Sequence, residues 1–225
     1  MDRHALWLSL ELASLTTLGL LVLGLPLAQW LATTRWRWKI VAEAVISLPL
    51  VLPPTVIGYY LLVSFGPRSP MGRAWIELTG RPLAFTFEGL VVASLLYGLP
   101  FAIQPFVASL SAVDRRLVEA SWSLGRSRLA TFFKVTLPLA APGVIAGAVL
   151  VFAHTLGEFG VVLMVGGNLP QETRTLSISI FDAVQALDYT RANTTAAFLL
   201  VVSFVVLLLT YMLRRYSPWT QATGS

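Results

Sequence analysis

Two ionisable side chains inside one long apolar stretch are the clearest candidates for chemistry. His154 and Glu158 are four residues apart, so a helix would place them on one face. Such a pair can relay a proton or begin a metal site. A complete metal or catalytic site is not expected, because the only other histidine is His4 and cysteine is absent. We expect Glu158 to be neutralised or hydrogen-bonded at a helix break between Gly157 and Gly160, where these residues would help to form a gate.

A proline cluster in the segment SLPLVLPPTVIGYYLL, residues 47–62, is the second candidate. Proline frees backbone carbonyls and kinks an apolar helix. Pro53 and Pro54 therefore form either a static kink packed against a neighbour or a hinge and constriction in a path. Thr55 and Tyr59 share a helical face and are candidates to line that path.

The composition indicates what kind of protein holds these residues. The chain has 225 residues, of which 56% are hydrophobic and 12% are charged, and its mean hydropathy is +0.75. These values exclude a disordered chain, a fibrous repeat and a nucleic-acid-binding domain, and they predict an integral membrane protein. The absence of cysteine excludes disulfides, zinc thiolate sites and thiol catalysis. No cofactor is expected.

Five apolar segments are long enough to cross a membrane as helices. We therefore predict an all-α integral membrane protein with one transmembrane domain over residues 1–225. The first segment is too long for a cleaved signal peptide and is interpreted as a retained span. The predicted spans cover residues 5–32, 40–65, 89–112, 139–165 and 194–213.

The positive charges predict the orientation of these spans. Ten Lys and Arg residues follow spans 1, 3 and 5, whereas six lie on the other side. The richer side should be cytoplasmic, so the amino terminus lies outside and the carboxyl terminus inside. Residues 66–88, outside, are expected to be irregular because of their prolines. Residues 168–193 should contain an amphipathic helix whose apolar stripe is Leu176, Ile180, Val184 and Leu187.

The cytoplasmic loop at residues 113–138 has the pattern of a helical hairpin. Leu117 and Leu124 lie on one predicted stripe, with Val113 and Ala120. Gly125 ends this helix, Ser127 caps a second helix over residues 128–134, and Leu137-Pro138 opens span 4. The hairpin is either a solvated connector or a contact for a soluble partner. The small residues Ala120, Ser121 and Gly125 favour a partner, because they permit close backbone approach.

This loop resembles a conserved-spacing motif of bacterial ABC importer permeases, E-A-A-x3-G-x9-I-x-L-P. Here Glu119-Ala120-Ser121 is followed at matching spacing by Gly125 and then by Val135-Thr136-Leu137-Pro138. The sequence departs from the motif only at Ser121 and Val135. The resemblance implies that Glu119, Ala120, Ser121, Gly125, Leu137 and Pro138 form a coupling loop that seats on an ATP-binding subunit.

The positions of the lysines indicate that this chain does not itself contain a phosphate-binding loop for ATP. A phosphate-binding loop needs the pattern G-x-x-x-x-G-K-[ST]. The only two lysines, Lys39 and Lys134, follow Trp38 and Phe133, so neither fits. If ATP drives this protein, another chain must bind it.

Further stretches resemble the molybdate (tungstate) permeases, which are related to the sulfate permeases. They are residues 47–62, 157–160, 166–170, 173–176 and 183–185. The resemblance implies the type I importer permease fold in the bacterial inner membrane, alternating access, and no enzymatic activity. It also implies a homodimer, two ATP-binding subunits and a periplasmic oxyanion-binding protein. Sulfate or thiosulfate remains an alternative substrate, and a secondary transporter, a channel or an intramembrane enzyme are alternative classes.

The charges also limit how an anion would be handled. Residues 4–34 and 135–173 contain no Lys or Arg. Spans 1 and 4 therefore offer an anion no fixed positive charge. We expect selection by a separate receptor and a weakly interacting path lined by Ser, Thr and backbone N–H groups.

Overall fold

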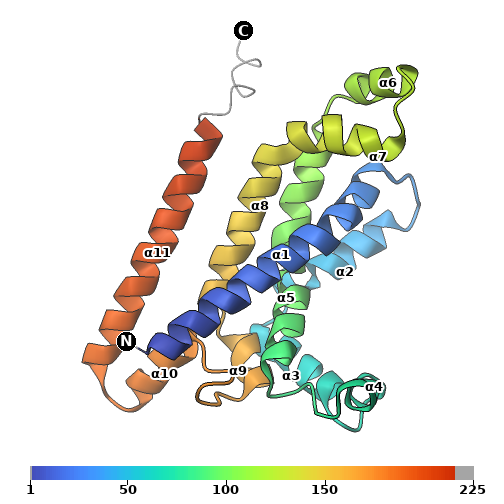
Figure 1. The fold of residues 1–225 in the computed structure, drawn as a ribbon. Helices are drawn as coiled ribbons and strands as arrows, with labels where there is room; N and C mark the ends of the chain where they lie inside the picture. The colour runs from blue at the N-terminus through green and yellow to red at the C-terminus, as the bar shows by residue number, and fades with distance from the viewer. Residues whose placement is uncertain (1, 216–225) are drawn as a thin grey trace.

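The computed structural model describes residues 2–215, and all regular elements in this range are helices (Figure 1). The first half contains α1 (Arg3–Thr33), α2 (Lys39–Val51), α3 (Pro54–Phe65), α4 (Pro70–Thr79), α5 (Phe87–Ser111) and α6 (Arg115–Ser123). The second half contains α7 (Arg128–Thr131), the π-helix η1 (Phe132–Thr136), α8 (Leu137–Gly157), α9 (Gly160–Gly166), α10 (Leu176–Gln185) and α11 (Tyr189–Arg215).

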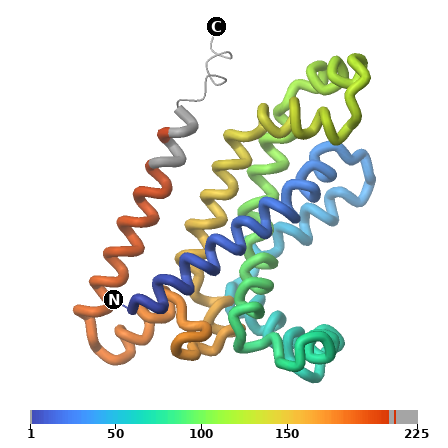
Figure 2. Tube along the Cα trace, viewed as in Figure 1, coloured from blue at the N-terminus to red at the C-terminus, as the bar shows by residue number. Residues whose placement is uncertain are grey.

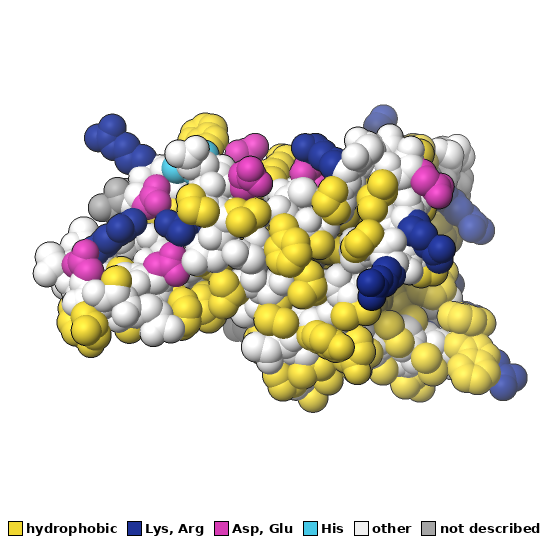
Figure 3. Space-filling model, turned by 90° about the horizontal axis from the view of Figure 1, so that it is seen from below, with side chains coloured by type: hydrophobic (Ala, Val, Ile, Leu, Met, Phe, Trp, Pro, Cys, Tyr) yellow, Lys and Arg dark blue, Asp and Glu magenta, His cyan; other side chains and the backbone are white. Residues whose placement is uncertain are grey.

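The molecule has two distinct ends. Helices α6 and α7 lie at one end, in a hairpin at residues 113–134 that we call the finger. Helices α4, α9 and α10 and the amino terminus lie at the other end (Figures 1 and 2). Helices α1, α5 and α8 run between the two ends, and α11 stands at the edge, where it packs on α8 and α10. Seen from the end opposite the finger, charged side chains of both signs lie among hydrophobic ones (Figure 3).

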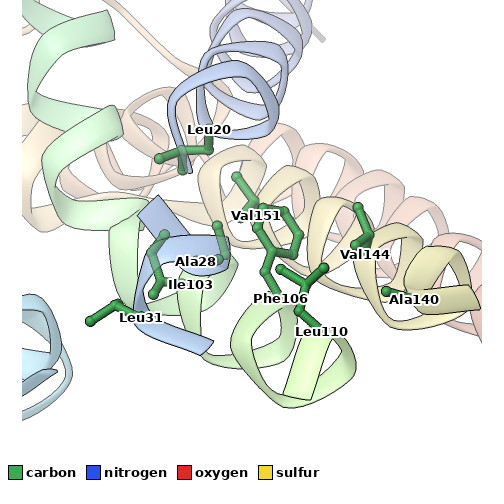
Figure 4. Packing of buried hydrophobic residues seen from close by; sticks show 10 residues of the cluster. Leu20, Ala28, Leu31, Ile103, Phe106, Leu110, Ala140, Val144 and Val151 are labelled. Carbon is green, nitrogen blue, oxygen red and sulfur yellow. The ribbon is translucent and has the colours of Figure 1, made fainter. Parts of the chain in front are cut away.

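The core lies between α1, α5 and α8. Leu20 and Ala28 of α1 pack with Phe106 of α5 and Val151 of α8 (Figure 4). Glycines on α8 bring this helix close to α5. A Cβ atom on Gly147 would lie 2.8 Å from the Pro105 Cγ, so the G-x-x-x-G spacing of α8 is used for packing within the chain.

The structure contains four or five candidate membrane spans, against the five predicted. Four helical segments of residues 2–208 are long and apolar enough to cross a membrane, and the bent pair α2–α3 gives a fifth if it is counted as one span. Spans 1 and 3 correspond to α1 and α5 within two residues. Span 5 corresponds to α11, which begins at Tyr189 and so extends further than predicted.

Span 2 is not the continuous helix that the sequence predicted. It consists of α2 and α3, which are bent by 111° at a break between them. Pro53 has an extended backbone with φ −54° and ψ 137°. Neither Pro53 nor Pro54 has an N–H group to continue the α2 ladder, so the helix ends at Val51 and restarts with Pro54 in its first turn.

Span 4 also differs from its predicted bounds. Helix α8 ends at Gly157 rather than near Val165, and α9 follows as a separate short helix. At its other end the helical path starts earlier, because α7 and η1 lead directly into α8. The Leu137 N–H donates to the Phe132 carbonyl five residues back. This wider turn comes immediately before Pro138, which lacks an N–H for the regular α-helical bond.

The segment at residues 66–88 was expected to be irregular, and this prediction is wrong for α4. The Ser69 hydroxyl caps α4 by accepting the Gly72 N–H at 2.8 Å. Pro70 occupies the first turn, where its missing N–H has no cost. Gly80, with φ +75°, ends the helix. The prolines thus mark helix boundaries rather than an unstructured loop.

The amphipathic helix expected in residues 168–193 exists as α10, but its buried face is not the predicted one. Leu176, Ser179 and Ala183 are buried, whereas Val184 and Leu187 are exposed. The reason is a tertiary contact at the start of the helix. The Ser9 hydroxyl of α1 accepts the Leu176 N–H at 2.8 Å, and this bond turns α10 onto α1.

Candidate functional site

The finger, residues 113–134, is a compact helical hairpin in which the predicted caps at Gly125 and Ser127 are joined by a cap at Asp114 that the sequence analysis did not predict. The Asp114 carboxylate accepts the Arg116 N–H at 2.8 Å and caps α6. Gly125 follows α6 with φ +80°, in the left-handed region that glycine adopts without strain. The Ser127 hydroxyl accepts the Ala130 N–H at 3.2 Å and starts α7. Local side-chain chemistry therefore determines this turn.

Ser121 holds the hairpin together. Its side chain is buried, and its Oγ lies 2.9 Å from the Thr131 Oγ1 on α7. The sequence predicts that Ser121 is one of the small residues that allow a partner to approach. In the structure it faces inward, and only Ala120 and Gly125 of this group are exposed. Thr131 is the partner that the sequence does not indicate, because it lies ten residues from Ser121 on the second helix of the hairpin.

Apolar side chains cover the outer surface of the finger. Leu124 is 80% exposed and Leu129 is 70% exposed, although each is large enough to favour burial. Glu119 is also exposed, and its carboxylate pairs with the Arg115 Nε at 2.8 Å. Exposed leucines next to charged side chains, at the end of a membrane protein, are typical of a contact surface. Leu117, Trp122 and Phe133 are exposed on the same hairpin.

Leu137 and Pro138 connect the finger to the membrane domain. Leu137 begins α8 directly after η1, and Pro138 lies in its first turn. Helical structure is thus continuous from Arg128 to Gly157, a distance of 30 residues.

Glu158 organises the break between α8 and α9. Its side chain is buried, and Oε1 accepts the Val161 N–H at 2.9 Å. This bond satisfies one of the free N–H groups at the start of α9. The Glu158 carbonyl accepts a hydrogen bond from the Ser177 hydroxyl. The expected hydrogen-bonded carboxylate at a helix break is therefore confirmed, and Gly157 lies exposed beside it.

The two helix breaks pack against each other. A Cβ atom on Gly160 would lie 2.7 Å from the Pro54 Cβ. One turn further along, a Cβ atom on Gly58 would lie 2.7 Å from the Met164 Cβ. Only glycine permits this approach of α3 and α9. The fold therefore brings together three predicted gate residues, Pro54, Glu158 and Gly160.

The other predicted path residues on α3 and before it are exposed. Pro53 caps α3, and both Pro53 and Thr55 are exposed. Tyr59 is 54% exposed and packs edge-on against Tyr60, with ring centroids 5.6 Å apart. Thr55 and Tyr59 thus remain accessible to a path or to a partner.

His154 lies beside Glu158 without a direct hydrogen bond to it. Its Nε2 is 3.7 Å from the Glu158 Oε2. The imidazole stacks on Phe101 with centroids 3.7 Å apart, and Tyr97 is 5.3 Å away. Within residues 2–215 no third histidine or carboxylate joins the pair to make a metal site. The geometry is that of an aromatic ring packed in an interior.

Asn168, Arg174 and Asp182 form a polar network at the end opposite the finger, which the sequence analysis did not predict. The Asn168 amide donates to the Asp182 carboxylate at 2.9 Å, and the Arg174 Nε donates to the Asn168 Oδ1 at 2.8 Å. These bonds fasten the loop after α9 to α10. The three residues are 6 to 14 positions apart, so spacing alone does not indicate the network.

Comparison with known proteins identifies the family. The family described as "Binding-protein-dependent transport system inner membrane component" matches residues 21–220. The chain belongs to this family. This permease is therefore a multi-pass transport component of the inner membrane and not an enzyme.

Relatives of known name cover the permease almost completely. It is 52% identical over 215 residues to "Molybdenum transport system permease protein ModB" of Azotobacter vinelandii, covering 96% of this chain and 95% of that protein. It is 35% identical over 218 residues to the protein of the same name from Escherichia coli K12, covering 97% and 93%.

Solved structures confirm the predicted all-α permease fold. The permease resembles a chain of a bacterial ABC transporter involved in the import of alginate, with TM-score 0.75, 17% identity, and coverage of 97% of this chain and 81% of that one. It also resembles a chain of the MetNI methionine ABC transporter, with TM-score 0.73, 17% identity, and coverage of 96% and 98%. At this identity the likeness concerns the fold.

Proposed function

We propose that this permease forms the transmembrane path of an ATP-driven importer of molybdate. The observation that carries the proposal is the finger, a capped hairpin with exposed leucines at one end of an otherwise membrane-embedded chain. Its sequence motif is that of a coupling loop. The substrate follows from the 52% identity to a molybdenum transport permease over nearly the full length of both chains. Sulfate or thiosulfate is the second candidate, because of the resemblance to sulfate permeases.

The finger lies in the cytoplasm in this proposal, where it binds the ATP-binding subunit. Ten of the sixteen basic residues flank spans 1, 3 and 5 on the finger side, which supports this orientation. Ala120 and Gly125 allow the close approach of a partner backbone, and Leu124 and Leu129 supply apolar area. Two copies of the permease would bind two ATP-binding subunits around a two-fold axis, with the path between the copies.

The path opens and closes by alternating access. Closure of the ATP-binding subunits would draw the two fingers together. The continuous helix from Arg128 to Gly157 supports transmission of this movement to the contact between Pro54 and Gly160. Because α3 and α9 are short helices held at two breaks, they can shift as a pair without unwinding a long span. Hydrolysis of ATP would return the path to its inward-open form.

A soluble receptor delivers the anion at the end opposite the finger. Charged residues of both signs lie among apolar ones there (Figure 3). An open cavity of about 450 Å³ on this end is lined by Trp7, Glu11, Arg81 and Glu88, among others. A mixed polar and aromatic surface of this kind fits the docking of a soluble protein. Selection by that receptor agrees with the lack of Lys and Arg in α1 after Arg3 and in α8.

The finger contact is tested by charge substitution. Leu124→Asp and Leu129→Asp should each abolish co-purification of the ATP-binding subunit, because each places a charge in an apolar contact. Leu78→Asp is the matched control, since Leu78 is 84% exposed but lies on α4 at the other end. Normal co-purification with both finger variants would contradict the proposal.

The substrate is tested by uptake into proteoliposomes that contain the permease, the ATP-binding subunit and the loaded receptor. We expect ATP-dependent accumulation of molybdate, with receptor-stimulated ATP hydrolysis. Preferential uptake of sulfate would assign the permease to the second candidate. Uptake of either anion without ATP would identify a secondary transporter or a channel instead.

A further inference from the structure

Helix α2 carries a polar stripe on an otherwise apolar sequence. Lys39, Glu43 and Ser47 follow one another at intervals of four residues, which places them on one helical face. The Lys39 ammonium lies 3.5 Å from the Glu43 carboxylate. The stripe begins where α2 begins, at the finger end, and runs toward the break before Pro53.

A polar residue of α5 faces this stripe. The Gln104 amide donates to the Ser47 hydroxyl at 3.3 Å. The two side chains line an open cavity of about 310 Å³ together with Glu43, which is large enough to hold water. The remaining lining residues are apolar and come from α1, α2 and α5: Leu31, Ile46, Ile103, Val107 and Ala108.

These polar groups lie away from the ends of their helices. Ser47 comes eight positions after the start of α2 at Lys39, which corresponds to about 12 Å along the helix. Gln104 comes seven positions before the end of α5 at Ser111, or about 10 Å. A hydrocarbon core about 30 Å thick makes an exposed amide this far along a spanning helix costly, so it must face a partner or water.

The opposite side of α2 has the character of a lipid-facing surface. A second groove there is lined only by apolar and tryptophan side chains, among them Trp36, Trp38, Val41 and Val45. Val45 is two residues from Ser47 and therefore lies about 200° away around the helix. Tryptophans are enriched at membrane interfaces. One side of α2 thus suits lipid, whereas the side that faces α5 does not.

We infer that the open cavity between α2 and α5 of each copy forms part of the finger-end wall of the path between the copies, and that Gln104 and Ser47 are hydrogen-bond donors to the passing oxyanion. The inference rests on the proposed function and names residues within it. A glutamine amide has two N–H donors and a serine hydroxyl has one, whereas a tetrahedral oxyanion offers acceptors. Lys39 pairs with Glu43, which lines the cavity, and so offsets its charge. Neutral donors bind an anion weakly, and weak binding permits its release.

The absence of cysteine from the chain allows a direct test of accessibility. Single Ser47→Cys and Gln104→Cys variants of the reconstituted complex are treated with an anionic, water-soluble methanethiosulfonate reagent. Val45→Cys is the matched control, two residues away on the other side of α2 and 59% exposed in the chain. We expect modification of both path cysteines at least tenfold faster than of the control, and slower modification when molybdate is present at millimolar concentration.

Two results of this experiment would overturn the inference. Equal rates at Ser47→Cys and Val45→Cys would show that the stripe is not in water. A disulfide between two copies at Ser47→Cys, without reaction with the reagent, would show that the stripe is a dry contact between permease copies.

Transport by polar-to-apolar variants gives an independent measurement. Gln104→Leu should lower molybdate uptake at least fivefold, while receptor-stimulated ATP hydrolysis stays within twofold of the unmodified complex. Thr17→Val is the control, because the Thr17 hydroxyl donates only to the Ala13 carbonyl of its own helix at 2.7 Å. Unchanged uptake by Gln104→Leu would contradict the inference. Sulfate uptake by the unmodified complex would instead contradict the molybdate assignment and leave the cysteine result intact.

Discussion

At the scale of single residues, Glu158 shows how a buried carboxylate serves a helix break. Its Oε1 accepts the Val161 N–H, and its carbonyl accepts the Ser177 hydroxyl. The side chain thus closes the gap left when α8 ends, and the main chain ties the break to α10. The carboxylate stabilises the start of α9. An effect of Glu158 on transport would therefore follow from the position of α9.

Substitution of Glu158 separates its cap from its charge. Glu158→Ala should lower the free energy of unfolding by about 1–2 kcal/mol, because the Val161 N–H loses its acceptor. Glu158→Gln keeps an acceptor oxygen and should retain most of that stability. Thermal unfolding of the purified protein in detergent measures both. Equal loss in the two variants would show that the charge, rather than the hydrogen bond, holds the break.

The contact between the two breaks is tested at glycine. Gly160→Ala should destabilise the protein by about 1–3 kcal/mol, since the new Cβ would meet the Pro54 Cβ at 2.7 Å. Gly157→Ala provides the comparison three residues away, because no atom lies within 4 Å of a Cβ there among the described residues. Unfolding midpoints report the difference. A lower midpoint for Gly157→Ala than for Gly160→Ala would argue against the packed contact.

At the scale of elements, the finger and α8 are connected by continuous helical structure. The Ser121–Thr131 contact joins α6 to α7, and η1 joins α7 to α8 without a break in the helical path. A partner bound to the finger would therefore contact a segment that continues as helix into α8, rather than an irregular loop. Continuous helix at this position supports the proposal that the permease transmits movement across the membrane.

Gly125 tests the finger as a docking element. Gly125→Trp strains a residue at φ +80° by roughly 1–2 kcal/mol and directs a large side chain outward, because no described atom lies within 4 Å of a Cβ at this position. We expect normal membrane insertion and loss of the ATP-binding subunit on co-purification. Gly125→Asn is the control, since asparagine tolerates the left-handed region. Retention of the subunit by Gly125→Trp would weaken the docking assignment.

At the scale of the whole molecule, orientation decides which partner meets which end. Single cysteines at Glu77 on α4 and at Arg126 on the finger place labels at opposite ends of a chain that has none. A membrane-impermeant maleimide should label Glu77→Cys in intact spheroplasts and Arg126→Cys only after permeabilisation. The reverse pattern would invert the topology and remove the finger from the side where ATP is available.

The sequence by itself determined the elements that depend on local chemistry. Five apolar stretches indicated the membrane-spanning segments, and Gly125 and Ser127 indicated the turn of the finger through caps that act within a few residues. The break at Glu158 was also predictable, because glycines flank a carboxylate in an apolar run. These features need only nearest neighbours along the chain.

Tertiary structure decided how the elements meet. The bend of 111° between α2 and α3 depends on packing against α9, which lies about 100 residues later. The buried face of α10 depends on Ser9, and the cavity between α2 and α5 joins Ser47 to Gln104. Local propensity indicates that proline breaks a helix but does not give the direction of the bend. That direction is fixed by contacts between distant segments, and the periodicity of the sequence does not indicate which distant segments will meet.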